Sequence, residues 1–135
     1  MFEIFAETRF SAAHQLRGYP GPCCRLHGHN WRIRVSVITD QLDEVGIGLD
    51  FRKLRASLEE ITGRLDHRNL NDVPPFDRIN PTSEHIARYI FEELKAKLTE
   101  AHGTLRSVQV SESETVAVTY WENRTAETQS AQRKP

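Results

Sequence analysis

Three histidines and a cysteine lie close together near the N-terminus: His14, Cys23, His27 and His29. Imidazole nitrogens and thiolates are the ligands that zinc prefers in proteins. His27 and His29 stand two residues apart in an expected strand, so both rings point to the same face and can reach one ion. A catalytic zinc keeps three protein ligands and one open position. The three histidines would supply those ligands, and the pattern therefore indicates a reactive metal centre.

Cys23 has more than one interpretation. It could be a fourth zinc ligand that closes a structural site, a free thiol that acts as a base or nucleophile, or a buried inert cysteine. A nearby zinc, Arg25 or a protonated histidine would favour the reactive thiolate. The adjacent Cys24 has the same chemistry, and spacing alone does not choose between the two thiols.

A carboxylate and an imidazole are adjacent at Asp66 and His67, where the first expected helix ends. A carboxylate that orients an imidazole is a general acid–base arrangement. Neighbours in sequence need not form a hydrogen bond with each other, so a polar helix end is the alternative. The pair is therefore a candidate for proton transfer that needs support from elsewhere in the chain.

Glu112 shares a strand face with Val108 and Val110. A carboxylate on a core-facing side must find hydrogen-bond donors, and a bound heterocycle with amino and ring N–H groups would supply them. The alternative is a strand-end glutamate that turns to solvent. Thr82 and Ser83 precede an expected helix and could form its N-cap.

Four strands and two helices must position these residues. Apolar and polar residues alternate over 2–10, 27–39, 108–112 and 115–121, which predicts strands. Apolar residues three or four apart, starting at Phe51, predict one helix that begins after an N-cap at Asp50. A second helix is predicted to end near His102, before Gly103. The order β-β-α-α-β-β indicates an α+β fold, with an antiparallel sheet and both helices on one face. A four-stranded sheet leaves two open edges, which favours association between subunits.

Composition narrows the classes of function. The chain has 135 residues and a net charge of −1, so we expect one domain and no electrostatic footprint for nucleic acid. It has no apolar run of about 20 residues that would span a membrane and no N-terminal signal pattern. Adjacent cysteines seldom bridge, which indicates reduced thiols and a cytoplasmic location. We expect a single domain over 1–122 and a disordered polar tail over 123–135.

Six short motifs resemble the family of 6-pyruvoyl-tetrahydropterin synthases and 6-carboxy-tetrahydropterin synthases, and are most similar to the bacterial queuosine-pathway branch. They occur in the family's order and spacing up to about residue 120. The matching segments are Phe10-Ser11-Ala12-Ala13-His14, Cys23-x-x-x-His27-Gly28-His29, Leu65-Asp66-His67, Leu70-Asn71-Asp72, Asn80-Pro81-Thr82-Ser83-Glu84 and Val110-Ser111-Glu112.

The resemblance implies a fold, an assembly and a metal. The fold is the tunnelling fold, whose subunits join their sheets into a trimeric barrel; two barrels stack as a homohexamer with active sites at subunit interfaces. The resemblance implies Zn²⁺ on His14, His27 and His29. It also selects Cys23, rather than Cys24, as the catalytic cysteine.

The remaining candidates acquire roles from the same resemblance. It assigns Asp66 and His67 to a proton relay that a neighbouring subunit supplies. It assigns Glu112, with Thr82 and Ser83, to binding of the pterin ring.

The activity that the resemblance implies is that of a zinc-dependent carbon–oxygen lyase. It would convert 7,8-dihydroneopterin triphosphate into 6-carboxy-5,6,7,8-tetrahydropterin, acetaldehyde and triphosphate, in queuosine biosynthesis. One alternative is a 6-pyruvoyl-tetrahydropterin synthase, which eliminates triphosphate in tetrahydrobiopterin synthesis. An alternative of another class is a non-catalytic binding module stabilised by zinc.

Overall fold

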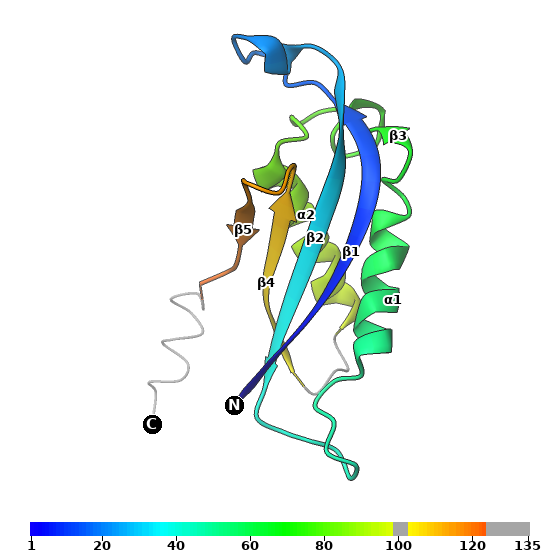
Figure 1. Cartoon of the computed structure of the whole chain (residues 1–135), viewed down its shortest axis with the longest axis vertical. Coiled ribbons are helices and arrows are strands. Elements are labelled where there is room, and N and C mark those ends of the chain that lie inside the picture. The colour runs from blue at the N-terminus through cyan, green and yellow to red at the C-terminus, as the bar shows by residue number, and fades with distance from the viewer. Residues whose placement is uncertain (99–102, 124–135) are drawn as a thin grey trace.

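The described part of the protein is a five-stranded sheet with two α-helices packed on one face (Figure 1). The computed structural model describes residues 1–98 and 103–123. The strands are β1 (Phe2–His14), β2 (His27–Thr39), β3 (Arg68–Asn69), β4 (Thr104–Ser111) and β5 (Val118–Tyr120). The α-helices are α1 (Phe51–Thr62) and α2 (Ser83–Lys97), and two short 3₁₀ turns are η1 (Pro22–Cys24) and η2 (Leu70–Asp72).

The sheet is centred on a long antiparallel pair, β1 and β2. Their ladder begins at Phe2 opposite Thr39 and ends at His14 opposite His27. The strand order is β3-β1-β2-β4-β5, and β4 and β5 continue the antiparallel pairing. The predicted α+β class and order of the main elements are thus confirmed. The prediction of a wholly antiparallel, four-stranded sheet is wrong in one respect, because β3 adds a two-residue strand parallel to β1. Two residues are too few for any periodicity to reveal.

Several element boundaries differ from the prediction. The first strand continues past Phe10 as far as His14, and β4 ends at Ser111, so Glu112 lies just beyond it. The second helix ends at Lys97. Residues 99–102, with the expected helix end near His102, lie outside the described part of the chain, as do residues 124–135 of the expected tail.

The core lies between the helices and the sheet. Asp50 caps α1, and its carboxylate accepts a hydrogen bond from the Arg52 N–H at 2.9 Å. Phe51, expected on the buried stripe, is 66% exposed because it begins the helix beyond the packed region. The side chains that are fully buried in this layer include Trp31, Ile33, Val35, Leu54, Leu58, Ile61, Ile86, Ile90 and Leu94. Burial of each large apolar side chain contributes about 1.5–3 kcal/mol.

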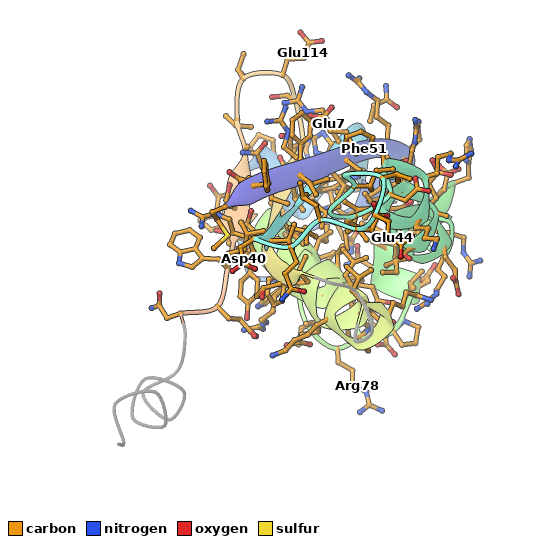
Figure 2. All side chains as sticks on the ribbon, turned by 90° about the horizontal axis from the view of Figure 1, so that it is seen from below. Glu7, Asp40, Glu44, Phe51, Arg78 and Glu114 are labelled. Carbon is orange, nitrogen blue, oxygen red and sulfur yellow. The ribbon has the colours of Figure 1, made fainter. Side chains whose placement is uncertain are left out.

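No helix formed by the described residues covers the other face of the sheet. Figure 2 looks at the molecule from below and shows the helices on one side of β1, with Glu7 labelled on the other. Glu7 forms an ion pair with Arg34 of β2 at 2.6 Å. The guanidinium of Arg34 also lies 4.3 Å from the centre of the Phe5 ring.

Neither the length nor the apolar content needed to span a membrane is found in any helix within residues 1–98 and 103–123.

Candidate metal centre and active site

The three histidines meet at the end of the β1–β2 ladder. His14 is the last residue of β1 and lies directly opposite His27, the first residue of β2. His29 follows two residues later and points to the same face. The ring centroids are 4.6 Å apart for His14 and His27, 5.1 Å for His14 and His29, and 4.8 Å for His27 and His29. One nitrogen from each ring lies within 4.8 Å of the others, so the predicted cluster forms.

Backbone carbonyls fix the orientation of two of these rings. Nδ1 of His14 lies 2.7 Å from the Pro81 carbonyl oxygen, and Nδ1 of His27 lies 2.7 Å from the Arg25 carbonyl oxygen. Because a carbonyl only accepts, each Nδ1 must carry the proton, which leaves a lone pair on Nε2. Metal-binding histidines are usually oriented in this way.

Burial favours the neutral form that a metal requires. His14 is almost fully buried, and desolvation lowers its pKa below the usual 6.5. Desolvation also lowers the pKa of His29, although the nearby carboxylate of Glu112 opposes the shift. Within residues 1–98 and 103–123, Nε2 of His14 and Nε2 of His29 are buried without a hydrogen-bond partner. A metal ion would satisfy both atoms, so these residues fit a Zn²⁺ site.

Trp31 forms the floor beneath the cluster. Its ring lies 4.9 Å from that of His14 and 5.1 Å from that of His29, and it is fully buried. Its indole N–H donates to the Ala12 carbonyl at 3.1 Å, which ties β2 to β1 below the histidines. Alternation over 27–39 predicts that Trp31 shares a strand face with Ile33 and Val35 but indicates no role in the site. The shared alternation of His27, His29 and Trp31 was the signal that could have identified its role.

Cys23 lies in the turn η1, within the connection between β1 and β2. Its backbone carbonyl accepts a hydrogen bond from the Leu16 N–H at 2.9 Å. Its side chain is half-buried and the neighbouring Cys24 is exposed; both are free cysteines. The metal-ligand cluster found among the described residues consists of the three histidines and does not include Cys23.

Asp66 and His67 form the predicted pair. Oδ2 of Asp66 lies 3.0 Å from Nδ1 of His67, and Oδ1 accepts the Ser11 N–H at 2.9 Å. The Ser11 N–H, and then His67, hold the pKa of Asp66 below its usual value. His67 has a left-handed backbone with φ 58°, which is uncommon for a residue with a side chain. Its side chain is 81% exposed, and the imidazole is therefore open to a partner molecule.

Glu112 and Ser83 lie together beside the histidines. The Ser83 hydroxyl donates to Oε1 of Glu112 at 2.9 Å, while Oε2 lies 3.7 Å from Nε2 of His29. Thr82 does not join this contact, because its hydroxyl accepts the His85 N–H and caps α2. The carboxylate of Glu112 is 31% exposed and keeps access to a ligand.

Two shallow hollows meet at His29. One, of about 480 Å³, has His29 and His67 in its lining. The other, of about 380 Å³, has His29 and Glu112 in its lining. The carboxylate of Glu112 thus lies beside the metal cluster, while His67 and His29 share only the lining of the first hollow.

The fold and the histidine cluster together define a class of small α+β proteins with a three-histidine centre at the end of a β-hairpin. The chain belongs to the 6-pyruvoyl tetrahydropterin synthase family, whose family model matches residues 3–123. The family resemblance inferred from the six motifs is therefore confirmed.

Known relatives cover nearly the whole chain. A 6-carboxy-5,6,7,8-tetrahydropterin synthase of Synechocystis sp. is 44% identical over 130 residues, covering 92% of this chain and 96% of the relative. A protein of the same name from Bacillus subtilis is 34% identical over 119 residues, covering 84% of this chain and 80% of the relative. The solved structure of Caenorhabditis elegans 6-pyruvoyl tetrahydropterin synthase matches with a TM-score of 0.80 and 29% identity, covering 90% of this chain and 96% of that chain.

Proposed function

We propose that this protein is a zinc-dependent 6-carboxy-5,6,7,8-tetrahydropterin synthase of queuosine biosynthesis. Its substrate would be 7,8-dihydroneopterin triphosphate. Elimination of triphosphate and hydrolytic cleavage of the side chain, with one water consumed, would give the 6-carboxy pterin and acetaldehyde. The main structural support is the three-histidine cluster with the carboxylate of Glu112 3.7 Å from the His29 ring. The similarity to the Synechocystis sp. synthase supports this branch over the pyruvoyl-forming one.

The three histidines would hold the zinc. His14, His27 and His29 provide neutral nitrogens, two of which are oriented by carbonyls. Bound there, Zn²⁺ would act as a Lewis acid on the hydroxyl groups of the substrate side chain. Three protein ligands leave a coordination position free for these oxygens.

Cys23 would act as the base that removes a proton from the substrate side chain. Its absence from the metal-ligand cluster supports this role over that of a fourth ligand in a closed structural site. Asp66 would orient His67, which would return a proton to the substrate. The high exposure of His67 supports its use by a substrate bound between two subunits.

Glu112 would anchor the pterin ring. A carboxylate accepts two parallel hydrogen bonds from an amino group and a ring N–H, which fixes the orientation of the heterocycle. The Ser83 hydroxyl already donates to Oε1, so the carboxylate is held in place before the ligand arrives. Thr82 would contribute through its position at the start of α2, next to Ser83.

We further propose that the active protein is a cytoplasmic homohexamer, a dimer of trimers with active sites at subunit interfaces. The open edges of the sheet, at β3 and β5, leave backbone groups available for pairing with another subunit. The outward position of His67 also supports a site that a second subunit completes.

Product identification tests the proposal. The zinc-loaded protein is incubated with 7,8-dihydroneopterin triphosphate, and products are identified by mass spectrometry. The proposal predicts a 6-carboxy pterin and acetaldehyde in equal amounts, together with triphosphate. A 6-pyruvoyl pterin would instead assign the protein to the pyruvoyl-forming branch. Unconsumed substrate would favour a non-catalytic binding module.

A further inference from the structure

The segment Gln15–Arg17 leaves the sheet after β1, and its backbone is held by a side-chain amide at Gln15. Oδ1 of Asn71 accepts the Gln15 N–H at 2.9 Å, and Nδ2 of Asn71 donates to the Gln15 carbonyl at 2.9 Å. One amide thus satisfies both backbone groups of one residue. This is the pattern that a neighbouring strand would provide.

A second asparagine repeats the arrangement at Arg17. Oδ1 of Asn80 accepts the Arg17 N–H at 2.9 Å, and Nδ2 donates to the Arg17 carbonyl at 2.7 Å. Gln15 and Arg17 are two residues apart, so their backbone groups face the same edge of an extended chain. Asn71 and Asn80 together form what we call the amide clamp.

The opposite edge of the clamped segment holds Cys23. Leu16 lies between the two clamped residues, and its N–H points to the other side, where it donates to the Cys23 carbonyl at 2.9 Å. Leu16 is therefore the one residue that links the segment held by the amide clamp to the backbone of Cys23. Movement of the clamped segment would move the backbone of Cys23 with it.

The clamp is itself fixed to the rest of the protein. Asn71 lies in η2, beside the fully buried Leu70, and its N–H donates to Oδ1 of Asn69 at 3.1 Å. The Asn80 carbonyl lies 2.7 Å from Nδ1 of His85 in α2. The residue after Asn80 is Pro81, whose carbonyl orients the metal-ligand candidate His14. The same segment thus positions a metal ligand and the loop that carries the thiol.

We propose that Asn71 and Asn80 are positioning residues that fix the backbone of the loop carrying Cys23. The inference rests on the proposed function of Cys23 as the base. Both positions require an asparagine, because a side-chain amide carries an acceptor oxygen and a donor nitrogen at the same distance from its own backbone. Asn71→Asp and Asn80→Asp keep the acceptor but turn a carboxylate oxygen toward a carbonyl oxygen.

The test compares single Asn71→Asp and Asn80→Asp variants with the wild type in two assays. Turnover is predicted to fall by roughly tenfold or more in kcat, with KM changed by less than about twofold, because substrate binding does not use the clamp. Separately, alkylation of Cys23 by iodoacetamide without substrate, in a Cys24→Ser background, is predicted to speed up roughly threefold or more as the loop opens. Zinc content should stay at the wild-type value.

Two further sets of variants test whether the effects depend on the amides of the clamp. Asn123→Asp introduces the same change at an exposed asparagine outside the clamp, after β5, and should match the wild type in both assays. Asn71→Ala and Asn80→Ala lose the bonds without adding charge and should change both readouts in the same direction, but less.

Unchanged kcat and unchanged alkylation in the alanine variants would overturn the inference. A loss of kcat with unchanged alkylation of Cys23 would also contradict it, since the amides would then act on another group. If the wild type converts no dihydroneopterin triphosphate, the proposed function fails, whereas the alkylation rates still decide whether the clamp holds Cys23.

Discussion

His14 and His27 face each other as the final pair of the β1–β2 ladder, with ring centroids 4.6 Å apart. Twelve further pairs continue the ladder without a break from this contact to Phe2 opposite Thr39. The distance between the two imidazoles is therefore set by the sheet, and only the carbonyls of Pro81 and Arg25 are needed to orient the rings. A site built in this way is rigid before any ligand binds.

Replacement of His14 should remove the metal. His14→Ala deletes one of three ligands, and the affinity for zinc is predicted to fall by roughly 100-fold or more. Metal content after dialysis, measured by elemental analysis, checks this. His67→Ala is the matched control, because His67 is exposed and lies outside the cluster, and it should keep the wild-type metal content. Equal metal in both variants would contradict the assignment of His14.

The metal-free protein should lose stability in mild acid. Burial lowers the pKa of His14 below 6.5 in the folded state, whereas the unfolded chain keeps the ordinary value. As the pH falls through 6.5, the unfolded state takes up the proton first, so the free energy of unfolding decreases. The slope is at most about 1.4 kcal/mol per pH unit for one proton.

Urea unfolding of the metal-free protein at a series of pH values measures this effect. His14→Gln should flatten the dependence, because the glutamine does not titrate. His29 contributes a change of the same sign, since burial also lowers its pKa. A free energy of unfolding that rises on acidification through this range would show that the buried histidines are not held neutral.

Glu112→Gln should weaken substrate binding and leave the metal in place. The change removes the negative charge that would accept two N–H groups of a pterin, and KM is predicted to rise roughly 10- to 100-fold. Steady-state kinetics with the pterin triphosphate measures it. Glu44→Gln alters an exposed carboxylate in the connection between β2 and α1 and should behave as the wild type.

Asp66→Asn should slow catalysis without unfolding the protein. The amide can still accept the Ser11 N–H, but the charge that orients and stabilises a protonated His67 is lost. A fall in kcat of roughly 10²–10⁴-fold is expected for a disrupted general acid–base pair. Rapid-quench measurement of a single turnover reports the chemical step directly. A single-turnover rate equal to that of the wild type would show that Asp66 takes no part in the proton relay.

Much of the fold could be predicted because it follows from short-range patterns. Alternation in β1 and β2 and the spacing of Leu54, Leu58 and Ile61 in α1 depend on neighbouring residues. The paired strand β3 could not be predicted, because its two residues carry no period and their partners, Ala12 and Ala13, lie more than fifty positions earlier. Tertiary packing also decided the exposure of Phe51.

In the candidate site, too, short-range patterns could be predicted and long-range contacts could not. The His-x-His spacing predicted two of the three histidines that form the cluster, and the contact between Ser83 and Glu112 was suggested only by the resemblance. The amide clamp gave no local signal, since Asn71 and Asn80 bind backbone groups 56 and 63 residues away. An asparagine beside a turn has many equivalent explanations, and only the folded chain shows which backbone its amide meets.

The central claim is that zinc is held by histidines alone while Cys23 performs chemistry. The most direct test is to measure the zinc content and the turnover of one sample of Cys23→Ala, with Cys24→Ala as its control. The account predicts that Cys23→Ala keeps one zinc per chain and loses turnover by roughly 10²–10⁴-fold. Cys24→Ala should keep both. Loss of zinc from Cys23→Ala, or wild-type turnover by it, would contradict the account.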